Sequence, residues 1–135
     1  MSEENVEAFK RGIAAWNRGD IDATLEVFDP EVEWRPTFRR LLGGDTAVYR
    51  GRHGVREFLQ DLDETWAELP IELTEIRDLG ERIVAIGHLR GRGKQSGAEL
   101  ESSIGYVVEF KNGKVIRMDD YLDHQEALEA AGLSE

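Results

Sequence analysis

The spacing of most apolar residues changes near Pro70, and that change restricts the fold of this chain more than any other feature. Before Pro70, most apolar side chains recur every three or four residues, which is the period of an amphipathic helix. From Ile71 to Leu122 they fall in short stretches bounded by turn residues, and many of them alternate with polar side chains, which is the period of a strand. Helices followed by a run of antiparallel strands predict an α+β domain with the helices packed on one face of a curved antiparallel sheet.

Three helices are expected before the sheet. The first runs from about Glu3 to Arg18, the second follows the capping residue Asp20 and ends at Pro30, and the third runs from about Arg52 to Ala67. Their inward-facing residues are Val6, Phe9, Ile13 and Trp16 in the first helix, Ile21, Leu25 and Phe28 in the second, and Val55, Phe58, Leu59, Leu62 and Trp66 in the third.

The strands follow from alternation and from turn residues. A short strand carries Val32 and Trp34 and stops at Pro36, and four more are expected, over Ile71–Leu79, Arg82–Gly91, Ala98–Lys111 and Lys114–Leu122. Asn112-Gly113 predicts a tight hairpin between the last two, because both residues tolerate positive φ. Asp123 and Glu126 predict a short terminal helix that Gly132 ends.

Alternation also assigns side chains to the two faces of the sheet. Asp120 shares a face with Met118 and Leu122, and Ile104 shares one with Tyr106. On the preceding strand, the set containing His88 and Arg90 is expected to face the same side as Asp120. Because both faces of that strand carry apolar residues, we also expect a homodimer formed through the outer face of the sheet.

Composition excludes several classes of protein. The 135 residues carry a net charge of −11 and include no cysteine, so disulfides, thiol catalysis and zinc-thiolate sites are excluded and a single cytoplasmic domain over residues 1–135 is expected. No signal peptide is expected from the acidic start of the sequence and no membrane span from its short apolar runs, and the negative charge disfavours nucleic acid and anionic membranes as partners. Three dispersed histidines predict no metal site, and no cofactor is expected.

One segment is basic although the chain as a whole is acidic. Residues 35–56 contain six arginines and one acidic residue, Asp45, a net charge of +5. The arginines are Arg35, Arg39, Arg40, Arg50, Arg52 and Arg56. They would either steer an anionic or carboxylated ligand or form ion pairs with the acidic helices or a second subunit.

Three segments together resemble the nuclear transport factor 2-like superfamily, within its SnoaL-like branch: IAAWNRGDIDATLEVFDPEVEW, YRGRHGVREFL and NGKVIRMDDYLDHQEALEAAGL. The resemblance covers essentially the whole chain and rests on the order and spacing of these segments. It implies a cone-shaped α+β barrel with a deep, mostly apolar pocket. Members include ketosteroid isomerases, limonene-type epoxide hydrolases and polyketide cyclases, so the fold alone does not fix the reaction.

The resemblance to the epoxide hydrolases places Asp120 at the position of a pocket aspartate. The partners differ, since His88 and Arg90 stand where those enzymes have an arginine and a second aspartate. Trp34 and Pro36 stand in place of a tyrosine and an asparagine. The hydrolases' arrangement of a water held between those groups is therefore not expected.

The resemblance to ketosteroid isomerase is weaker still. Gly12 and Pro36 replace the tyrosine and the proton-abstracting aspartate, although Tyr106 lies near the position of the second, protonated acid. An isomerase that uses that arrangement is excluded.

Asp120 is the main catalytic candidate and His88 the second. A carboxyl group among apolar side chains is expected to have a raised pKa and to act as a general acid or base. An alternative is a buried structural ion pair between Asp120 and Arg90 or His88. The expected substrate-binding residues are Arg90, Tyr106, Trp34, Met118, Ile104, Leu122 and Phe58.

Two functions follow from these residues. The first is a cofactor-independent isomerase, cyclase or hydrolase for a small, largely apolar organic molecule, with Asp120 as the proton carrier. The second is a dimeric ligand-binding or interaction module that keeps the pocket without catalysis.

Overall fold

The computed structural model describes residues 2–37 and 47–133, and within them the helices and strands follow the expected order. They are α1 (Ser2–Arg18), α2 (Ile21–Glu26), β1 (Phe28–Arg35), β2 (Tyr49–Arg50), α3 (Gly51–Thr65), β3 (Trp66–Glu68), β4 (Ile71–Asp78), β5 (Arg82–Gly93), β6 (Glu99–Lys111), β7 (Lys114–Tyr121) and α4 (His124–Ala130). The α+β class with a short C-terminal helix is confirmed.

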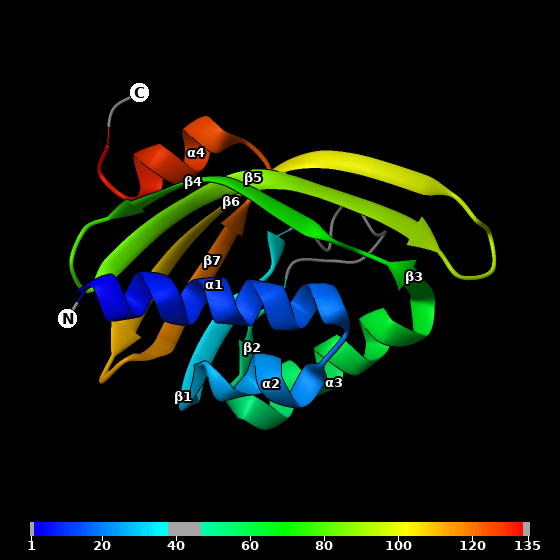
Figure 1. The fold of residues 1–135 in the computed structure, drawn as a ribbon, viewed down its shortest axis with the longest axis horizontal. Coiled ribbons are helices and arrows are strands. Elements are labelled where there is room, and N and C mark those ends of the chain that lie inside the picture. The colour runs from blue at the N-terminus through cyan, green and yellow to red at the C-terminus, as the bar shows by residue number, and fades with distance from the viewer. Residues whose placement is uncertain (1, 38–46, 134–135) are drawn as a thin grey trace.

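The strands form one curled sheet. Their order is β2-β1-β7-β6-β5-β3, and β4 also pairs with β5. Figure 1 shows the sheet curling over α1, with α2 and α3 below it and α4 on its outer side. The inner core lies between the sheet and α1–α3.

The sheet is mixed, which corrects the expectation of an antiparallel one. β1 runs parallel to β7, and Trp34 lies opposite Met118. Because most of the chain separates these two strands, their connection is long enough to allow either direction.

The boundary between α2 and β1 also differs from the prediction. α2 ends at Glu26, and Phe28 is buried as the first residue of β1 instead of on the helix. Pro30, expected to end the helix, lies inside β1 where the register with β7 is interrupted between Phe28 and Glu33. Proline has no N–H to donate to the ladder, and it is tolerated at this position because the pairing is interrupted there.

The predicted hairpin is confirmed. Asn112 and Gly113 have φ angles of 53° and 80°, and Lys111 pairs with Lys114 across the turn. Positive φ at both positions is what a type I′ turn requires. The Asp123 side chain accepts a hydrogen bond from the Gln125 N–H at the start of α4.

A second, smaller core lies on the outer side of the sheet under α4. Val84 and Val107 of the sheet pack there against Leu128 and Ala131. This contact explains why both faces of β5 carry apolar residues, the observation behind the expected homodimer. The homodimer itself stays a prediction.

Gly105 sets how closely α4 approaches the sheet. A Cβ at this position would lie 2.6 Å from the Cβ of Ala127. We expect Gly105→Ala to lower the free energy of unfolding by about 1–3 kcal/mol, because α4 must move outward. Urea denaturation would measure this, and adding Ala127→Gly should recover part of the loss. An unchanged urea midpoint in the single variant would contradict this packing.

Candidate functional site

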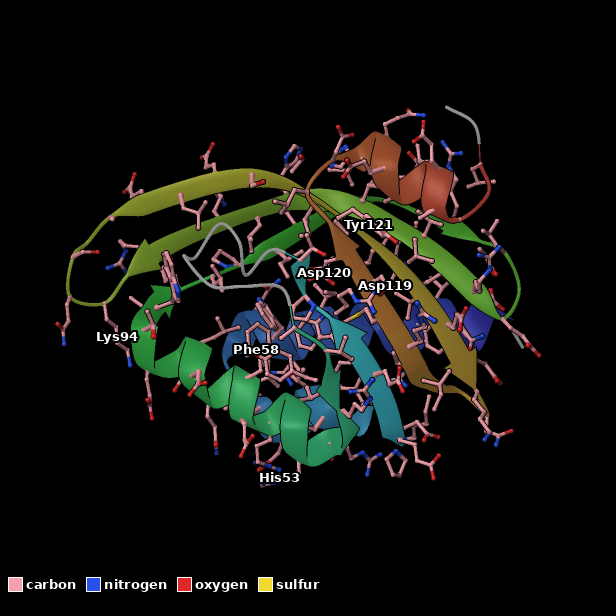
Figure 2. All side chains as sticks on the ribbon, turned by 180° about the vertical axis from the view of Figure 1, so that it is seen from behind. His53, Phe58, Lys94, Asp119, Asp120 and Tyr121 are labelled. Carbon is pink, nitrogen blue, oxygen red and sulfur yellow. The ribbon has the colours of Figure 1, made fainter. Side chains whose placement is uncertain are left out.

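Asp120 lies on the inner face of β7 and is completely buried. Figure 2 shows it on the strand between the outward-facing Asp119 and Tyr121. Its Oδ1 accepts a hydrogen bond of 2.9 Å from the Trp34 indole N–H. Its Oδ2 has no hydrogen-bond partner among the described residues. One oxygen of a fully buried carboxyl group is therefore unused.

The surroundings of Asp120 favour its neutral form. Burial raises the pKa of this carboxyl group well above its ordinary value, the Trp34 hydrogen bond lowers the pKa in part, and the charge of Asp119 raises it again. A neutral carboxylic acid in an apolar site can donate a hydrogen bond or a proton to an oxygen atom of a bound molecule.

Tyr106 lies beside Asp120 on the neighbouring strand. The two residues are opposite each other in the β6–β7 register, and Tyr106 is buried in the inner core. Burial raises the pKa of the Tyr106 phenol well above its ordinary value, and the Asp120 charge adds to the shift. Burial therefore favours the neutral, proton-bearing form of each of these two side chains, which lie at neighbouring positions of the sheet.

Trp34 is held in place by aromatic rings on several sides. Its ring centroid lies 5.1 Å from that of Phe58, 6.1 Å from Phe28 and 6.3 Å from Trp16. Edge-to-face and offset stacked contacts of this kind stabilise aromatic clusters beyond their burial alone. The indole N–H that reaches Asp120 is thus fixed by packing.

The inner cavity is much smaller than the deep pocket implied by the family resemblance. It has a volume of about 30 Å³, which is room for about one or two water molecules. Trp34, Tyr106 and Met118 line it, together with Phe9 and Trp16 among others. In the part of the chain that the structure describes, aromatic side chains fill the space that a ligand would occupy.

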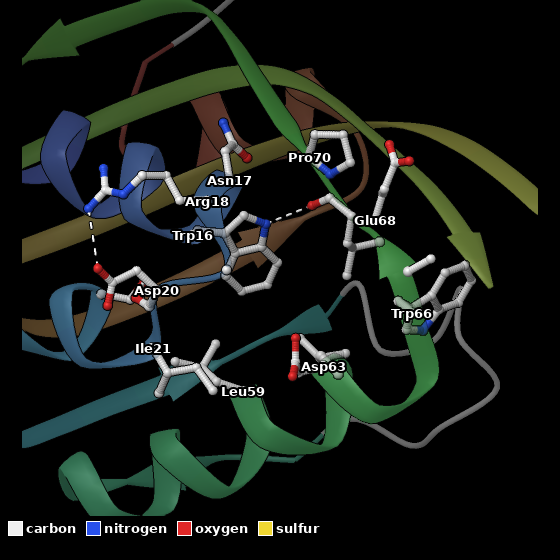
Figure 3. A pocket seen from close by; sticks show the side chains of 15 residues that line it. Trp16, Asn17, Arg18, Asp20, Ile21, Leu59, Asp63, Trp66, Glu68 and Pro70 are labelled. Carbon is white, nitrogen blue, oxygen red and sulfur yellow. Dashed lines mark hydrogen bonds and ion pairs between the residues drawn. The ribbon is translucent and has the colours of Figure 1, made fainter. Parts of the chain in front are cut away.

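A larger cleft opens on the surface beyond Trp16. It has a volume of about 360 Å³ and lies between the ends of α1 and α3, the start of α2 and the segment from β3 to Pro70 (Figure 3). Trp16 and Thr24 line both this cleft and the inner cavity. They form the wall between the two spaces.

Sequence reasoning missed this cleft because it assigned Trp16 and Trp66 to the core. Both tryptophans are half-buried and line the cleft. Their positions in the sequence could have indicated the cleft. Each tryptophan is the last aromatic residue of a helical stripe, and charged residues follow it.

The predicted inward orientation of His88 and Arg90 is wrong. Both side chains are exposed on the outer face, because the β5–β6 register places Gly87, and not His88, opposite Ile104. The His88 ring instead contacts the His124 ring edge-to-face at 5.7 Å. Neither residue can form the proposed buried ion pair with Asp120 across the sheet.

The other predicted site residues do face the inner core. Trp34, Phe58, Ile104, Tyr106 and Met118 are buried there, and the half-buried Leu122 packs against the same core. Their inward placement is confirmed, and their role in binding a substrate stays a prediction.

The arginine-rich segment is described only in part. Arg39, Arg40 and Asp45 lie outside the described residues. Arg56 pairs with Asp22 of α2 at 2.8 Å, and Arg50 pairs with Glu33 of β1 at 3.5 Å. These two contacts agree with the ion-pair interpretation, while the steering of an anionic ligand stays a prediction.

Over residues 2–37 and 47–133, no three histidine or acidic side chains are arranged to hold a metal ion. Within the same residues, every helix is too short or too polar to cross a membrane.

Comparison with known families agrees with this architecture. The model of the SnoaL-like domain matches residues 9–118. The chain belongs to the SnoaL-like family. No curated protein is significantly similar to this SnoaL-like domain in sequence.

Three solved structures illustrate the range of similar proteins. An NTF2-like protein from Burkholderia xenovorans LB400 is 27% identical, with 97% of each chain covered and a TM-score of 0.75. TerC co-crystallised with polyporic acid is 24% identical, with 89% of this chain and 92% of TerC covered and a TM-score of 0.78. The third is a hypothetical protein with a ketosteroid isomerase-like fold from Catenulispora acidiphila DSM 44928, in complex with trimethylamine. It is 15% identical, with 94% of this chain and 93% of that protein covered and a TM-score of 0.76.

Proposed function

We propose that this SnoaL-like domain is a cofactor-independent enzyme for a small, largely apolar organic molecule that carries an oxygen atom. The observation that carries the proposal is Asp120, a fully buried carboxyl group with one oxygen unused among the described residues. Similar folds crystallised with polyporic acid and with trimethylamine support a small organic ligand. The reaction class is isomerisation, cyclisation or hydrolysis.

In this proposal Asp120 carries the proton. The neutral acid gives its proton to a carbonyl or epoxide oxygen of the substrate, and the resulting carboxylate keeps the hydrogen bond from Trp34, which stabilises its charge. A proton from a substrate carbon or from an added water then returns to the carboxylate and restores the acid. Tyr106 is the second hydrogen-bond donor to the substrate oxygen.

Substrate entry requires the inner side chains to move. The inner cavity of about 30 Å³ is smaller than any organic substrate of this kind. The wall formed by Trp16 and Thr24 separates it from the large cleft. Opening of that wall would join the two spaces and admit a ligand toward Tyr106 and Asp120.

The second candidate is a non-catalytic ligand-binding module, and two observations favour it. The inner cavity is small, and the exposed positions of His88 and Arg90 remove the two polar partners expected for Asp120. In this alternative, Asp120 only binds a ligand oxygen.

Turnover of a panel of epoxides, enones and polyketide-like esters tests the proposal. Asp120→Asn keeps the shape of the side chain and an acceptor for Trp34 but carries no acidic proton, so we expect at least a 100-fold loss of kcat. Asp119→Asn, one residue away on the outer face, is the matched control and should stay within about twofold.

Two outcomes would contradict catalysis by Asp120. One is equal turnover by the parent and Asp120→Asn. The other is ligand binding without turnover by the parent, which would establish the binding module instead.

A further inference from the structure

We infer that the large cleft beside Trp16 is a separate binding site for an organic monocation, an ammonium group attached to an alkyl or aryl body. The cleft has a volume of about 360 Å³, within the range of small-molecule sites. It does not include Asp120, and Trp16 and Thr24 separate it from the inner cavity. Binding of a cation there needs no opening of that wall and no turnover at Asp120, so its test does not depend on the proposed reaction.

Two indole rings form aromatic walls of this cleft. The Trp16 N–H donates a 2.7 Å hydrogen bond to the Leu69 carbonyl oxygen, which fixes the orientation of its ring. Trp66 packs against the backbone of Gly91, where an added Cβ would lie 3.1 Å from the indole ring. Tryptophan is the aromatic side chain whose ring face attracts cations most strongly.

Apolar side chains complete the walls. They come from α2, from α3 and from the turn that precedes β4, and they are Ile21, Leu59, Leu62, Leu69 and Pro70. Such side chains provide contact for an alkyl or aryl body.

The charged side chains around the cleft have a net negative sign. Arg18 lies 3.6 Å from Asp20, whose other oxygen caps α2. Glu68 pairs with Arg92. Asp63 has no ion pair or hydrogen bond with any described residue, and Figure 3 shows its carboxylate pointing from α3 into the cleft. An entering cation would meet an acidic group that no other described side chain neutralises.

Charge also excludes the opposite class of ligand. Arg18, the sole cation among the described lining residues, is already paired, and the whole chain carries a net charge of −11. A carboxylate ligand would therefore be repelled by Asp63 and Glu68. The combination of two indoles and one uncommitted carboxylate selects a positively charged organic group.

Titration of the protein with benzyltrimethylammonium tests the inference, with benzyl alcohol and benzoate as neutral and anionic comparisons. We expect saturable binding of the cation, at least fivefold weaker binding of the alcohol and no binding of benzoate. In ¹⁵N-resolved NMR spectra the indole signals of Trp16 and Trp66 should shift, and that of Trp34 should not.

Two variants locate the cation. Asp63→Asn should weaken its binding roughly two- to fivefold, and Trp66→Leu should weaken it roughly two- to thirtyfold. Asp61→Asn removes the same charge from an exposed position of α3 outside the cleft and should leave the affinity unchanged.

Three results would overturn the site. They are absence of cation binding at millimolar concentration, equal affinity for benzyl alcohol, and equal effects of Asp63→Asn and Asp61→Asn. Because Asp63 is exposed, its substitution does not threaten the fold, so a loss of binding in that variant reports on the cleft.

Discussion

Replacing Trp34 by alanine is expected to lower the free energy of unfolding by about 3–5 kcal/mol. The side chain is 2% exposed and lies at the centre of the aromatic cluster with Trp16, Phe28 and Phe58. Its loss leaves a large void and removes the one hydrogen bond that Asp120 receives among the described residues. Chemical denaturation followed by circular dichroism would measure the change.

Trp34→Phe separates the two contributions. Phenylalanine keeps most of the aromatic packing but has no N–H for Asp120, and we expect a loss of about 1–3 kcal/mol for the unpaired buried carboxyl group, plus a smaller cavity cost. If Trp34→Phe destabilises the protein as much as Trp34→Ala, the lost hydrogen bond to Asp120, and not the lost packing, accounts for the destabilisation. If neither variant changes the unfolding midpoint, the cluster does not hold the inner core together.

We expect the free energy of unfolding of Asp120→Asn to rise relative to that of the parent protein as pH rises from about 4 to 8. The pKa of Asp120 is raised in the folded state, so above the ordinary aspartate pKa the unfolded chain ionises the carboxyl group more readily than the folded protein does. Fewer protons on the unfolded chain mean that the parent loses stability as pH increases. Asparagine does not titrate, so the variant avoids this loss.

The size of the effect follows from the raised pKa. Each pKa unit between the folded and unfolded states corresponds to about 1.4 kcal/mol. Urea denaturation at several pH values between 4 and 8 would measure the free energies of unfolding of the parent and of Asp120→Asn. Asp119→Asn is the control for removal of a carboxylate from the same strand. A difference that does not change with pH would mean that Asp120 is already ionised in the folded protein.

Local sequence patterns predicted the parts of the site that depend on one strand. Asp120 alternates with Met118 and Leu122, and the structure places Asp120 and Met118 in the buried interior and Leu122 against it. The Asn112-Gly113 turn fixed the pairing of β6 with β7. A shift of the register by one residue between Glu109 and Phe110 then places Tyr106, and not Gly105, opposite Asp120, so the turn alone does not predict this pair.

The face of β5 could not be predicted in the same way. Its register with β6 pairs even-numbered residues with odd-numbered ones, so that Gly87 lies opposite Ile104 and His88 opposite Ser103. A change of one residue in the turn between Gly93 and Ala98 would reverse this assignment. Because both faces of β5 bury apolar residues, one set inside and one under α4, alternation alone gives no preference.

Packing between elements that are distant in the chain could not be predicted from the sequence either. The aromatic residues that were expected to line a pocket largely fill it, and this depends on how Trp34 meets Phe28 and Phe58 from separate elements. The parallel direction of β1 against β7 has a similar origin, since no short turn links the two strands.

That parallel pairing also determines when the acidity of Asp120 can develop. Trp34 and Asp120 are 86 residues apart, and their hydrogen bond joins the first long strand to the last strand of the sheet. Contacts between such distant segments form late, because the long intervening loop must first close. During synthesis, the hydrogen bond between Trp34 and Asp120 therefore cannot form until β7 has left the ribosome. The burial that raises the pKa of Asp120 is therefore complete only once the first and last long strands of the sheet are paired.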